Sequence, residues 1–395
     1  MKYACLFLLV LYTQICSAQQ LKEVASQKRL IIMMFDGFGM SYYDHAPMPN
    51  LKQMAAKGFF KEVSALMPTV TNLNNTAICC ARLPERTGIT GNSFLSTSNQ
   101  EEYMEDQSLL QAPTIFQKLK KYGAKSALIA SKKKSIALLS KDTEIALSPE
   151  TADSSWTDIL SEPPGIYSSE VNFWTFRAAL HILKTRPDIR CIYIHTTDYP
   201  MHMWAPDDSA SLKHLAGIDA YLGAIMNELP DALVMITADH DVNHKSRCVD
   251  LENTLKNRQL KIKIAISAER DKYLKHHRGF GGTSYVYLNN KQDEARIKEA
   301  LLKIPGVEKV LTRKEACELY HLLPGRIGDL VVLADSVTVF GNLSDNKYEE
   351  ELPQNYRTHG SEYEKKVPLI IYNSGKLPPE SYFRYNYNLT GWLME

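Results

Sequence analysis

Five short apolar runs recur along the chain, and helix-like or polar sequence separates them. The runs occupy residues 29–35, 126–130, 191–195, 232–237 and 367–372. Unbroken apolar runs of this length, rich in Ile, Val, Leu and Met, are typical of strands buried on both faces of a parallel sheet. Residues 112–123 and 212–229 show helical spacing instead, and a glycine ends the first of these segments. Alternating strands and helices predict an α/β fold with a central, mostly parallel sheet flanked by helices.

The segment from 245 to 345 breaks this pattern because it is more charged and mixes its elements differently. Residues 295–319 read as helix, turn, strand and helix, and "TSYVYL" and "DLVVLAD" read as further strands. The main sheet resumes near Val367. We therefore predict that residues 19–244 and 346–395 form the main α/β domain and that 245–345 form a small α+β insertion.

The first 18 residues have the pattern of an export signal. Lys2 supplies a positive start, residues 5–12 are apolar, and small residues precede a cleavage site after Ala18. The apolar run is far shorter than the ~20 residues of a membrane span. A buried first element is the alternative, and Ile15 disfavours a lipid anchor at Cys16. We expect an exported protein, periplasmic or secreted, with no membrane association after signal removal.

Charge and cysteine content narrow the choice of partners. The chain has 395 residues, with 46 basic and 45 acidic side chains and a formal net charge of +1. This balance indicates no nucleic-acid or anionic-membrane partner. Five cysteines remain after signal removal, which is too sparse and odd a set for a disulfide framework. Cys79 and Cys80 could form a redox pair or bind metal, but we favour small buried side chains at the start of a helix.

Three aspartates follow three of the predicted strands, namely Asp36, Asp198 and Asp239. Ligands of open parallel sheets bind outside the carboxyl ends of the strands, so we expect these side chains to meet at one site. Clustered carboxylates repel one another and raise each other's pKa values. Cations placed between them remove this penalty.

Histidines complete the candidate metal site. His202 lies four residues after Asp198, His240 follows Asp239 directly, and His359 lies in a loop before the last strand. Aspartate with neutral histidine suits zinc, and less selectively iron or manganese. Taken singly, each aspartate could be a helix cap and each histidine a surface residue. The helix-cap alternative does not account for the paired histidines.

The stretch "MPTVTNLNNTAICC" (67–80) contains a candidate nucleophile, Thr71. It lies just before a helix that we predict over 73–82. A hydroxyl at a helix N-terminus feels the positive end of the helix dipole, and a bound metal lowers its pKa further. The alternative is that Thr71 only caps the helix.

Six segments in this order carry a family resemblance: "MMFDGFG", "MPTVTNLNNTAI", "ERTGITGNSF", "HTTDYPMH", "ITADHD" and "THGS". They resemble the alkaline phosphatase superfamily, and within it the nucleotide pyrophosphatase/phosphodiesterase and phosphonoacetate hydrolase branch. The resemblance runs from Asp36 to Gly360. It implies an alkaline-phosphatase-like fold in which the insertion at 245–345 is a cap domain.

The resemblance also implies two zinc ions, with Mn²⁺ or Fe²⁺ as possible substitutes. By motif match, Thr71 is the nucleophile, Thr69 is not catalytic, and Asn92 in "GITGN" holds a phosphoryl oxygen. The implied ligands of one ion are Asp36, Thr71, Asp239 and His240, and those of the other are Asp198, His202 and His359.

Two details of the sequence favour phosphonoacetate as the substrate, cleaved to acetate and phosphate. Asn75 stands where the diesterases usually have histidine, and Lys132 and Lys134 match a pair of lysines in the phosphonoacetate hydrolases. Lys133 departs from that pattern, because the residue between the pair is usually acidic. Two lysines can bind the substrate carboxylate and stabilise the charge that develops when the C–P bond breaks. The alternative for these lysines is a solvated basic turn.

Two other functions stay open. An exported type I phosphodiesterase or nucleotide pyrophosphatase could use the same metal site, and export suits it better than it suits phosphonate catabolism. A binding protein without turnover is disfavoured because the nucleophile and all the implied ligands are present. In each case the partner is a small phosphonate or phosphodiester anion.

Overall fold

The structure is a computed structural model, and it describes residues 20–23, 25–272, 278–344 and 346–394. The signal peptide predicted at 1–18 lies outside these residues. Within the described ranges, no helix combines the length and apolar character that crossing a bilayer requires.

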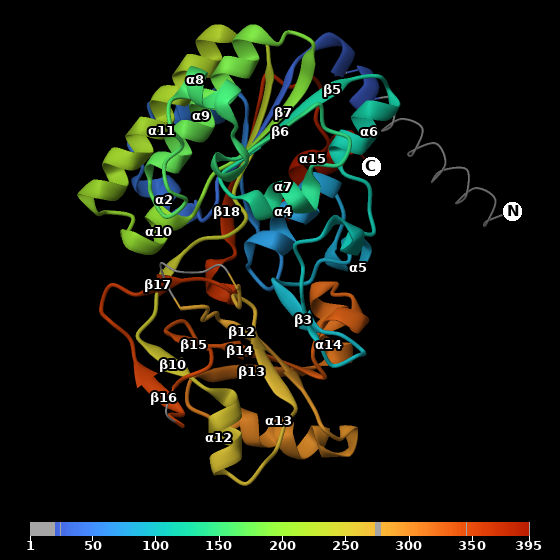
Figure 1. Cartoon of the computed structure of the whole chain (residues 1–395), viewed down its shortest axis with the longest axis vertical. Helices are drawn as coiled ribbons and strands as arrows, with labels where there is room; N and C mark the ends of the chain where they lie inside the picture. The colour runs from blue at the N-terminus through green and yellow to red at the C-terminus, as the bar shows by residue number, and fades with distance from the viewer. Residues whose placement is uncertain (1–19, 24, 273–277, 345, 395) are drawn as a thin grey trace, which may run out of the picture.

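A sheet of seven strands forms the centre of the larger part of the molecule (Figure 1). The five predicted strands are all present in it, which confirms the α/β fold class. Their order is β2 (Phe59–Ser64), β18 (Lys366–Tyr372), β8 (Leu233–Thr237), β1 (Leu30–Met34), β7 (Ile189–His195), β5 (Lys125–Ala130) and β6 (Ile145–Leu147). β18 runs antiparallel to β8 and β2, and the other recorded pairings in this sheet are parallel. β2 and β6 at the two edges were not predicted, because one is half exposed and the other is very short.

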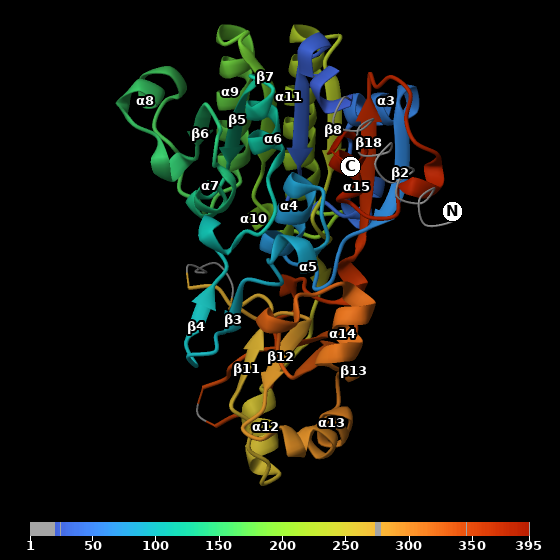
Figure 2. The same ribbon diagram turned by 90° about the vertical axis from the view of Figure 1, so that its right-hand side faces the viewer.

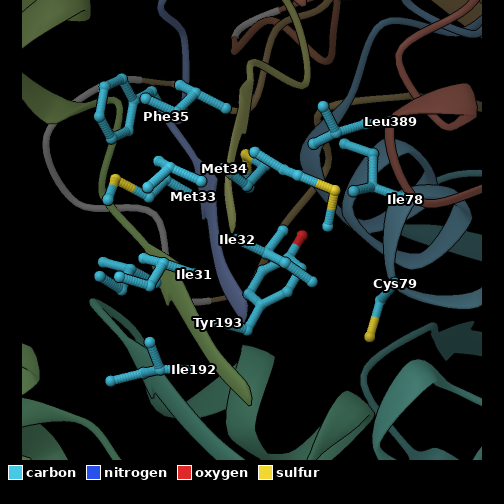
Figure 3. Packing of buried hydrophobic residues seen from close by; sticks show 14 of the residues in the cluster. Ile31, Ile32, Met33, Met34, Phe35, Ile78, Cys79, Ile192, Tyr193 and Leu389 are labelled. Atoms are coloured by element: carbon cyan, nitrogen blue, oxygen red, sulfur yellow. The ribbon is translucent and has the colours of Figure 1, made fainter. Parts of the chain in front are cut away.

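Helices cover both faces of this sheet. One face packs against α2 (Met40–His45), α3 (Pro49–Lys57), α9 (Glu170–Thr185) and α11 (Ser209–Glu228), and the other against α4 (Thr71–Cys80), α6 (Ile115–Lys121), α7 (Lys133–Leu139) and α15 (Asn388–Met394). The predicted helices at 112–123 and 212–229 are thus confirmed as α6 and α11. Every residue of β1 is buried, as strands covered on both faces require. Figure 3 shows its alternation, with Ile32 and Met34 directed toward Ile78 and Leu389.

A smaller part of the molecule lies below the central sheet in Figures 1 and 2. It contains a four-stranded antiparallel sheet in the order β11 (Ile264–Ser267), β12 (Thr283–Tyr287), β14 (Leu330–Ala334) and β13 (Val307–Thr312). A three-stranded sheet joins β15 (Thr338–Phe340), β10 (Arg247–Val249) and β16 (Glu349–Glu351), so its last strand lies just past residue 345. The accompanying helices are α12 (Leu251–Asn257), α13 (Glu294–Leu302) and α14 (Arg313–Tyr320). The division into a main domain and a cap stays a prediction.

Other short elements are α5 (Pro84–Thr87), β3 (Ser93–Leu95), β4 (Glu101–Tyr103), α10 (Tyr199–Met203), β9 (Asn243–His244) and β17 (Arg357–Thr358). The short helix α8 (Ser154–Leu160) packs on α9 in the larger part.

The three strands that precede the predicted aspartates are neighbours in the sheet. β1 lies between β8 and β7, and Met34 pairs with Thr237 on one side and His195 on the other. The carboxyl ends of these parallel strands are therefore level with one another. In Figure 2 the dark blue arrow of β1 points down toward the smaller part. The site thus lies at the sheet edge that faces the smaller part, as the rule for open parallel sheets predicts.

Candidate active site

Asp36, Asp198 and Asp239 meet where the three strands end, and all three are buried. One oxygen of each carboxylate is held by a protein group. Asp36 Oδ2 lies 3.4 Å from His195 Nε2, and Asp198 Oδ1 lies 3.1 Å from Lys132 Nζ. Asp239 Oδ1 accepts hydrogen bonds from two backbone N–H groups. The second oxygen of each carboxylate faces histidines of the site.

Four of the predicted metal ligands form a tight group around the start of α4. Thr71 Oγ1 lies 3.3 Å from both Asp36 Oδ1 and His240 Nε2. His240 Nε2 also lies 3.2 Å from Asp239 Oδ2 and 3.6 Å from Asp36 Oδ1. Asp239 Oδ2 has no hydrogen-bond partner among the described residues. This is the set implied for the first ion.

The remaining predicted ligands form a second group beside the first. Asp198 Oδ2 lies 2.9 Å from His202 Nε2 and 3.7 Å from His359 Nε2. His202 is near Asp198 because α10 begins directly after the aspartate and brings residue i+4 over it. Ligand atoms of Asp36, Asp198 and His240 also lie within 4.8 Å of one another, so the two groups adjoin.

The three histidines of these groups are oriented in the same way. His202 Nδ1 lies 2.7 Å from the backbone oxygen of Arg357, and His359 Nδ1 lies 2.7 Å from that of Thr69. His240 Nδ1 lies 3.0 Å from the backbone oxygen of Asp241. A carbonyl oxygen only accepts, so each Nδ1 carries the hydrogen and leaves the lone pair on Nε2. This is the usual orientation of histidines that bind metal through Nε2.

The electrostatics of the carboxylates also favour a cation. Burial and the charges of Asp198 and Asp239 raise the pKa of Asp36 to about 6. Burial acts to raise the pKa of Asp239 as well, but His240 outweighs it and lowers that pKa below its ordinary value. Ligands at ~2.0 Å from a tetrahedral ion lie roughly 3.3 Å apart, close to most of the distances above. The residues therefore fit a pair of divalent metal ions.

Thr71 is the first residue of α4, two residues earlier than the predicted helix start. The N-cap position belongs to Val70, and no side chain in the described part of the protein caps this helix. The capping alternative for Thr71 is therefore wrong, because its hydroxyl contacts Asp36 and His240 instead. Asn74 fixes the helix to the preceding loop, since its Oδ1 accepts a hydrogen bond from the backbone N–H of Leu66.

Asn92 lies in the loop before β3, beside the start of α4. The backbone N–H of Met104 donates to the Asn92 carbonyl, and Asn72 donates to the Met104 carbonyl. These bonds connect Asn92 to the residue that follows Thr71. Its buried Oδ1 has no hydrogen-bond partner within the described part of the chain.

The side chains of Lys132 and Lys134 turn inward, and Lys133 is exposed. The two inward side chains are 14% and 12% exposed. Lys132 Nζ pairs with Asp198, and Lys134 Nζ lies 2.5 Å from Asp271 Oδ2. These contacts contradict the alternative of a solvated basic turn. All three lysines line a cavity of about 670 Å³, and Lys132 connects that cavity to the metal-ligand groups.

Sequence reasoning missed three residues of this region. His195 ends β7 and contacts Asp36, although it stands inside the quoted segment "HTTDYPMH". Asp271 and Glu269 come from the loop after β11, where no motif marked them. Glu269 Oε2 lies 3.3 Å from His359 Nε2, and burial together with the charge of Asp198 raises the pKa of Glu269 to about 8.

Two other sequence predictions can be placed. Asn75 does not line the cavity; it is buried behind the site and contacts Tyr193 and His195. Cys79 and Cys80 are buried free thiols near the end of α4, not at its start. Burial raises the pKa of Cys80 to about 12, as expected for an inert side chain.

The chain is similar to known proteins in both sequence and fold. A model of the type I phosphodiesterase/nucleotide pyrophosphatase family matches residues 30–362. The phosphonoacetate hydrolase of Sinorhizobium meliloti 1021, solved with phosphonoacetate, is 28% identical, and the alignment covers 93% of this chain and 95% of that one at a TM-score of 0.83.

Two other relatives have lower sequence identity, and one of them is matched over only part of its length. Murine ectonucleotide pyrophosphatase/phosphodiesterase 5 is 16% identical over 92% of this chain and 93% of that one, with a TM-score of 0.67, which supports the fold. A bis(5′-adenosyl)-triphosphatase of Xenopus laevis is 25% identical over 232 residues, or 55% of this chain. The match spans about half of that relative, 47% of its length.

Proposed function

The chain belongs to the type I phosphodiesterase/nucleotide pyrophosphatase family of the alkaline phosphatase superfamily, and from this premise we propose that it is a two-zinc phosphonohydrolase. Its substrate would be phosphonoacetate, cleaved to acetate and phosphate. The observation that carries this choice is the inward position of the two lysines, Lys132 beside Asp198 and Lys134 beside Asp271. Similarity to a phosphonoacetate hydrolase over nearly the whole chain supports it.

The chain's own residues would hold the two ions in the adjoining groups described above. Asp36, Thr71, Asp239 and His240 would bind one ion, and Asp198, His202 and His359 the other. When bound, such ions lower the pKa of a coordinated hydroxyl and offset negative charge on phosphoryl oxygens.

Thr71 is placed to act as the nucleophile. Its Oγ1 lies between Asp36 and His240 at the N-terminus of α4, where the helix dipole favours negative charge. Oγ1 gives its proton to solvent and attacks phosphorus, so the Oγ1–P bond forms while the C–P bond breaks. Water then attacks the phosphothreonine, which releases phosphate and restores the hydroxyl.

The lysines would assist departure of the organic group. When the C–P bond breaks, its electron pair passes to the α-carbon and spreads into the neighbouring carboxylate. Lys132 and Lys134 supply positive charge there, and the carbanion then takes a proton from solvent to become acetate. Asn92 would bind a phosphoryl oxygen through its side-chain amide as negative charge builds on it.

A second candidate is an exported type I phosphodiesterase on the same site. The cavity of about 670 Å³, whose lining includes Tyr103, Ile166 and Tyr167, is far larger than phosphonoacetate requires and lies in the range of pockets that hold drug-sized ligands. Export, which the N-terminal sequence predicts, suits such an enzyme. Its alkoxide leaving group needs no carboxylate clamp, so the lysines separate the two candidates.

The test replaces both lysines with methionine, which preserves side-chain length without charge. If the lysines clamp the substrate carboxylate, the double variant loses phosphonoacetate turnover by roughly 100-fold or more, as loss of a transition-state donor does. Lys141→Met is the matched control because that side chain is exposed and lies outside the cavity. Unchanged phosphonoacetate turnover in the double variant would contradict the substrate assignment.

A further inference from the structure

A chain of buried hydrogen bonds runs behind the candidate active site and ends at Asp36. The Tyr193 hydroxyl donates to Asn75 Oδ1 at 2.6 Å. Asn75 Nδ2 lies 3.1 Å from His195 Nδ1, and His195 Nε2 lies 3.4 Å from Asp36 Oδ2. All four side chains are buried, and Figure 3 shows Tyr193 within the core between β1 and α4.

The donors and acceptors in this series of hydrogen bonds follow one order. Because Tyr193 donates to Oδ1 of Asn75, the amide presents its NH₂ group to His195. An NH₂ group only donates, so His195 Nδ1 must accept and carries no hydrogen. The hydrogen of the neutral ring then sits on Nε2, which faces Asp36 Oδ2. His195 therefore has the opposite tautomer to His202, His240 and His359, whose Nδ1 atoms face carbonyl oxygens.

This order of donors and acceptors matters because it decides which oxygen of Asp36 faces the candidate metal site. With Oδ2 held by the Nε2–H of His195, Oδ1 is left toward Thr71 Oγ1 and His240 Nε2. Asp239 Oδ1 accepts from backbone N–H groups, and Asp198 Oδ1 is paired with a lysine. Both kinds of group can only donate a hydrogen bond. Asp36 differs from the other two because the donor to its Oδ2 is His195, and the amide of Asn75 sets which nitrogen of His195 carries the hydrogen.

We propose that Tyr193, Asn75 and His195 are positioning residues that present Asp36 Oδ1 to the metal ion beside Thr71. The inference rests on the proposed metal centre and adds residues that contact neither the ion nor the substrate. Hydrogen bonds to coordinating carboxylates typically contribute about 10–100-fold to metal affinity. Asn75 is thereby given a role in the metal centre in place of contact with the substrate.

The first test determines the tautomer of His195 in the wild-type protein. Long-range ¹H–¹⁵N correlation spectra of histidine-labelled wild-type protein report which ring nitrogen carries hydrogen. The signals of His195 are those that disappear in the His195→Gln variant. We expect them to show hydrogen on Nε2. Hydrogen on Nδ1 of His195 would overturn the proposal, because the amide of Asn75 could not then donate to it.

The second test measures zinc affinity by competition with a chelator. His195→Leu removes the donor to Asp36, so we expect one of the two ions to bind about 10–100-fold more weakly. His195→Gln is the matched control, since the glutamine NH₂ group can take the place of Nε2–H and should preserve most of the affinity. Equal affinity in the leucine, glutamine and wild-type proteins would contradict the positioning role.

A third comparison reverses one hydrogen bond without changing shape. Asn75→Asp places an acceptor where the NH₂ group donated, so His195 must carry hydrogen on Nδ1, and we expect the ¹H–¹⁵N spectra to show that hydrogen. Asn388→Asp is the control, because Asn388 uses only its Oδ1 as an acceptor. If the wild type binds no zinc, the proposed function fails; if it binds two ions that none of these variants affects, only the positioning role fails.

Discussion

The backbone oxygen of Thr69 lies 2.7 Å from Nδ1 of His359, which joins the loop of the candidate nucleophile, Thr71, to a candidate metal ligand. The side chain of Thr69 strengthens this connection. Its Oγ1 accepts a hydrogen bond from the backbone N–H of Gly360 and donates to the carbonyl of Ser361. Thr69 and His359 are 290 residues apart in sequence. The contact between them therefore connects the segment that carries Thr71 to a histidine of the second ligand group.

Replacing Thr69 with valine tests this coupling. The variant keeps the shape but leaves the buried N–H of Gly360 without its partner, so we expect a loss of about 1–3 kcal/mol in the free energy of unfolding. We also expect weaker retention of one zinc ion, because His359 loses its support. Chemical denaturation and metal analysis measure both effects. Thr69→Ser retains the hydroxyl and should behave like the wild type; a stable valine variant with full zinc content would refute the coupling.

Replacing Thr71 with alanine separates an enzyme from a binding protein. We expect turnover to be lost while the fold persists, because the side chain is small and its contacts are confined to the site. Phosphate release gives the rate, and calorimetric titration with phosphonoacetate gives the affinity. Turnover of the alanine variant comparable to the wild type would eliminate Thr71 as nucleophile.

A buried ion pair supports the loop that carries His359. Lys245 Nζ lies 2.7 Å from Glu364 Oε1, and both side chains are completely buried. Glu364 Oε2 accepts from the N–H and the hydroxyl of Ser361, two residues after His359. We expect Lys245→Met to cost about 3–5 kcal/mol in unfolding free energy, because it leaves a buried carboxylate unpaired. The control, Lys245→Met combined with Glu364→Gln, should recover part of that loss; no loss in the single variant would contradict this account.

The same pair predicts how stability changes with pH. Burial acts to raise the pKa of Glu364, but Lys245 outweighs it and lowers that pKa below its ordinary value. A lowered folded-state pKa gives stability that is fully present above the unfolded value of about 4.3 and is lost as the pH falls through the folded value. The difference in unfolding free energy between wild type and the double variant should therefore shrink below about pH 4. A difference that grew on acidification would have the wrong sign.

The aromatic lining of the cavity tests the second candidate function. Tyr103 and Tyr167 line it, and Lys272 Nζ lies 5.0 Å from the centre of the Tyr103 ring. If a bulky leaving group binds there, Tyr167→Ala should lower kcat/KM for an aryl nucleotide ester by roughly tenfold, since stacking on an aromatic ring contributes about 1–3 kcal/mol. Phosphonoacetate turnover should not change. Tyr348→Ala, an exposed tyrosine outside the cavity, is the control; equal effects of both variants would argue against binding at this aromatic lining.

The sheet and the clustering of the three aspartates were predictable because each leaves a local pattern in the sequence. Buried strands show as unbroken apolar runs, and the aspartates that follow β1, β7 and β8 meet because neighbouring parallel strands end at one edge. The direction of β18 was not predictable, since an apolar run looks the same whether the strand runs parallel or antiparallel.

Contacts across the two parts of the molecule leave no such pattern. Asp271 pairs with Lys134 across 137 positions of sequence, and Glu269 reaches His359 from the loop after β11. The position of Asn75 was hidden for another reason. A helix whose ten residues are all buried gives no amphipathic pattern to show that Asn75 points at Tyr193 and His195.

The measurement that tests the central claim most directly is kcat/KM of the zinc-loaded protein for phosphonoacetate and for an aryl ester of a nucleoside monophosphate, side by side. The account predicts strong preference for phosphonoacetate, because Lys132 and Lys134 supply charge that only a carboxylate-bearing leaving group uses. Preference for the nucleotide ester would contradict it and would leave the two lysines as structural partners of Asp198 and Asp271.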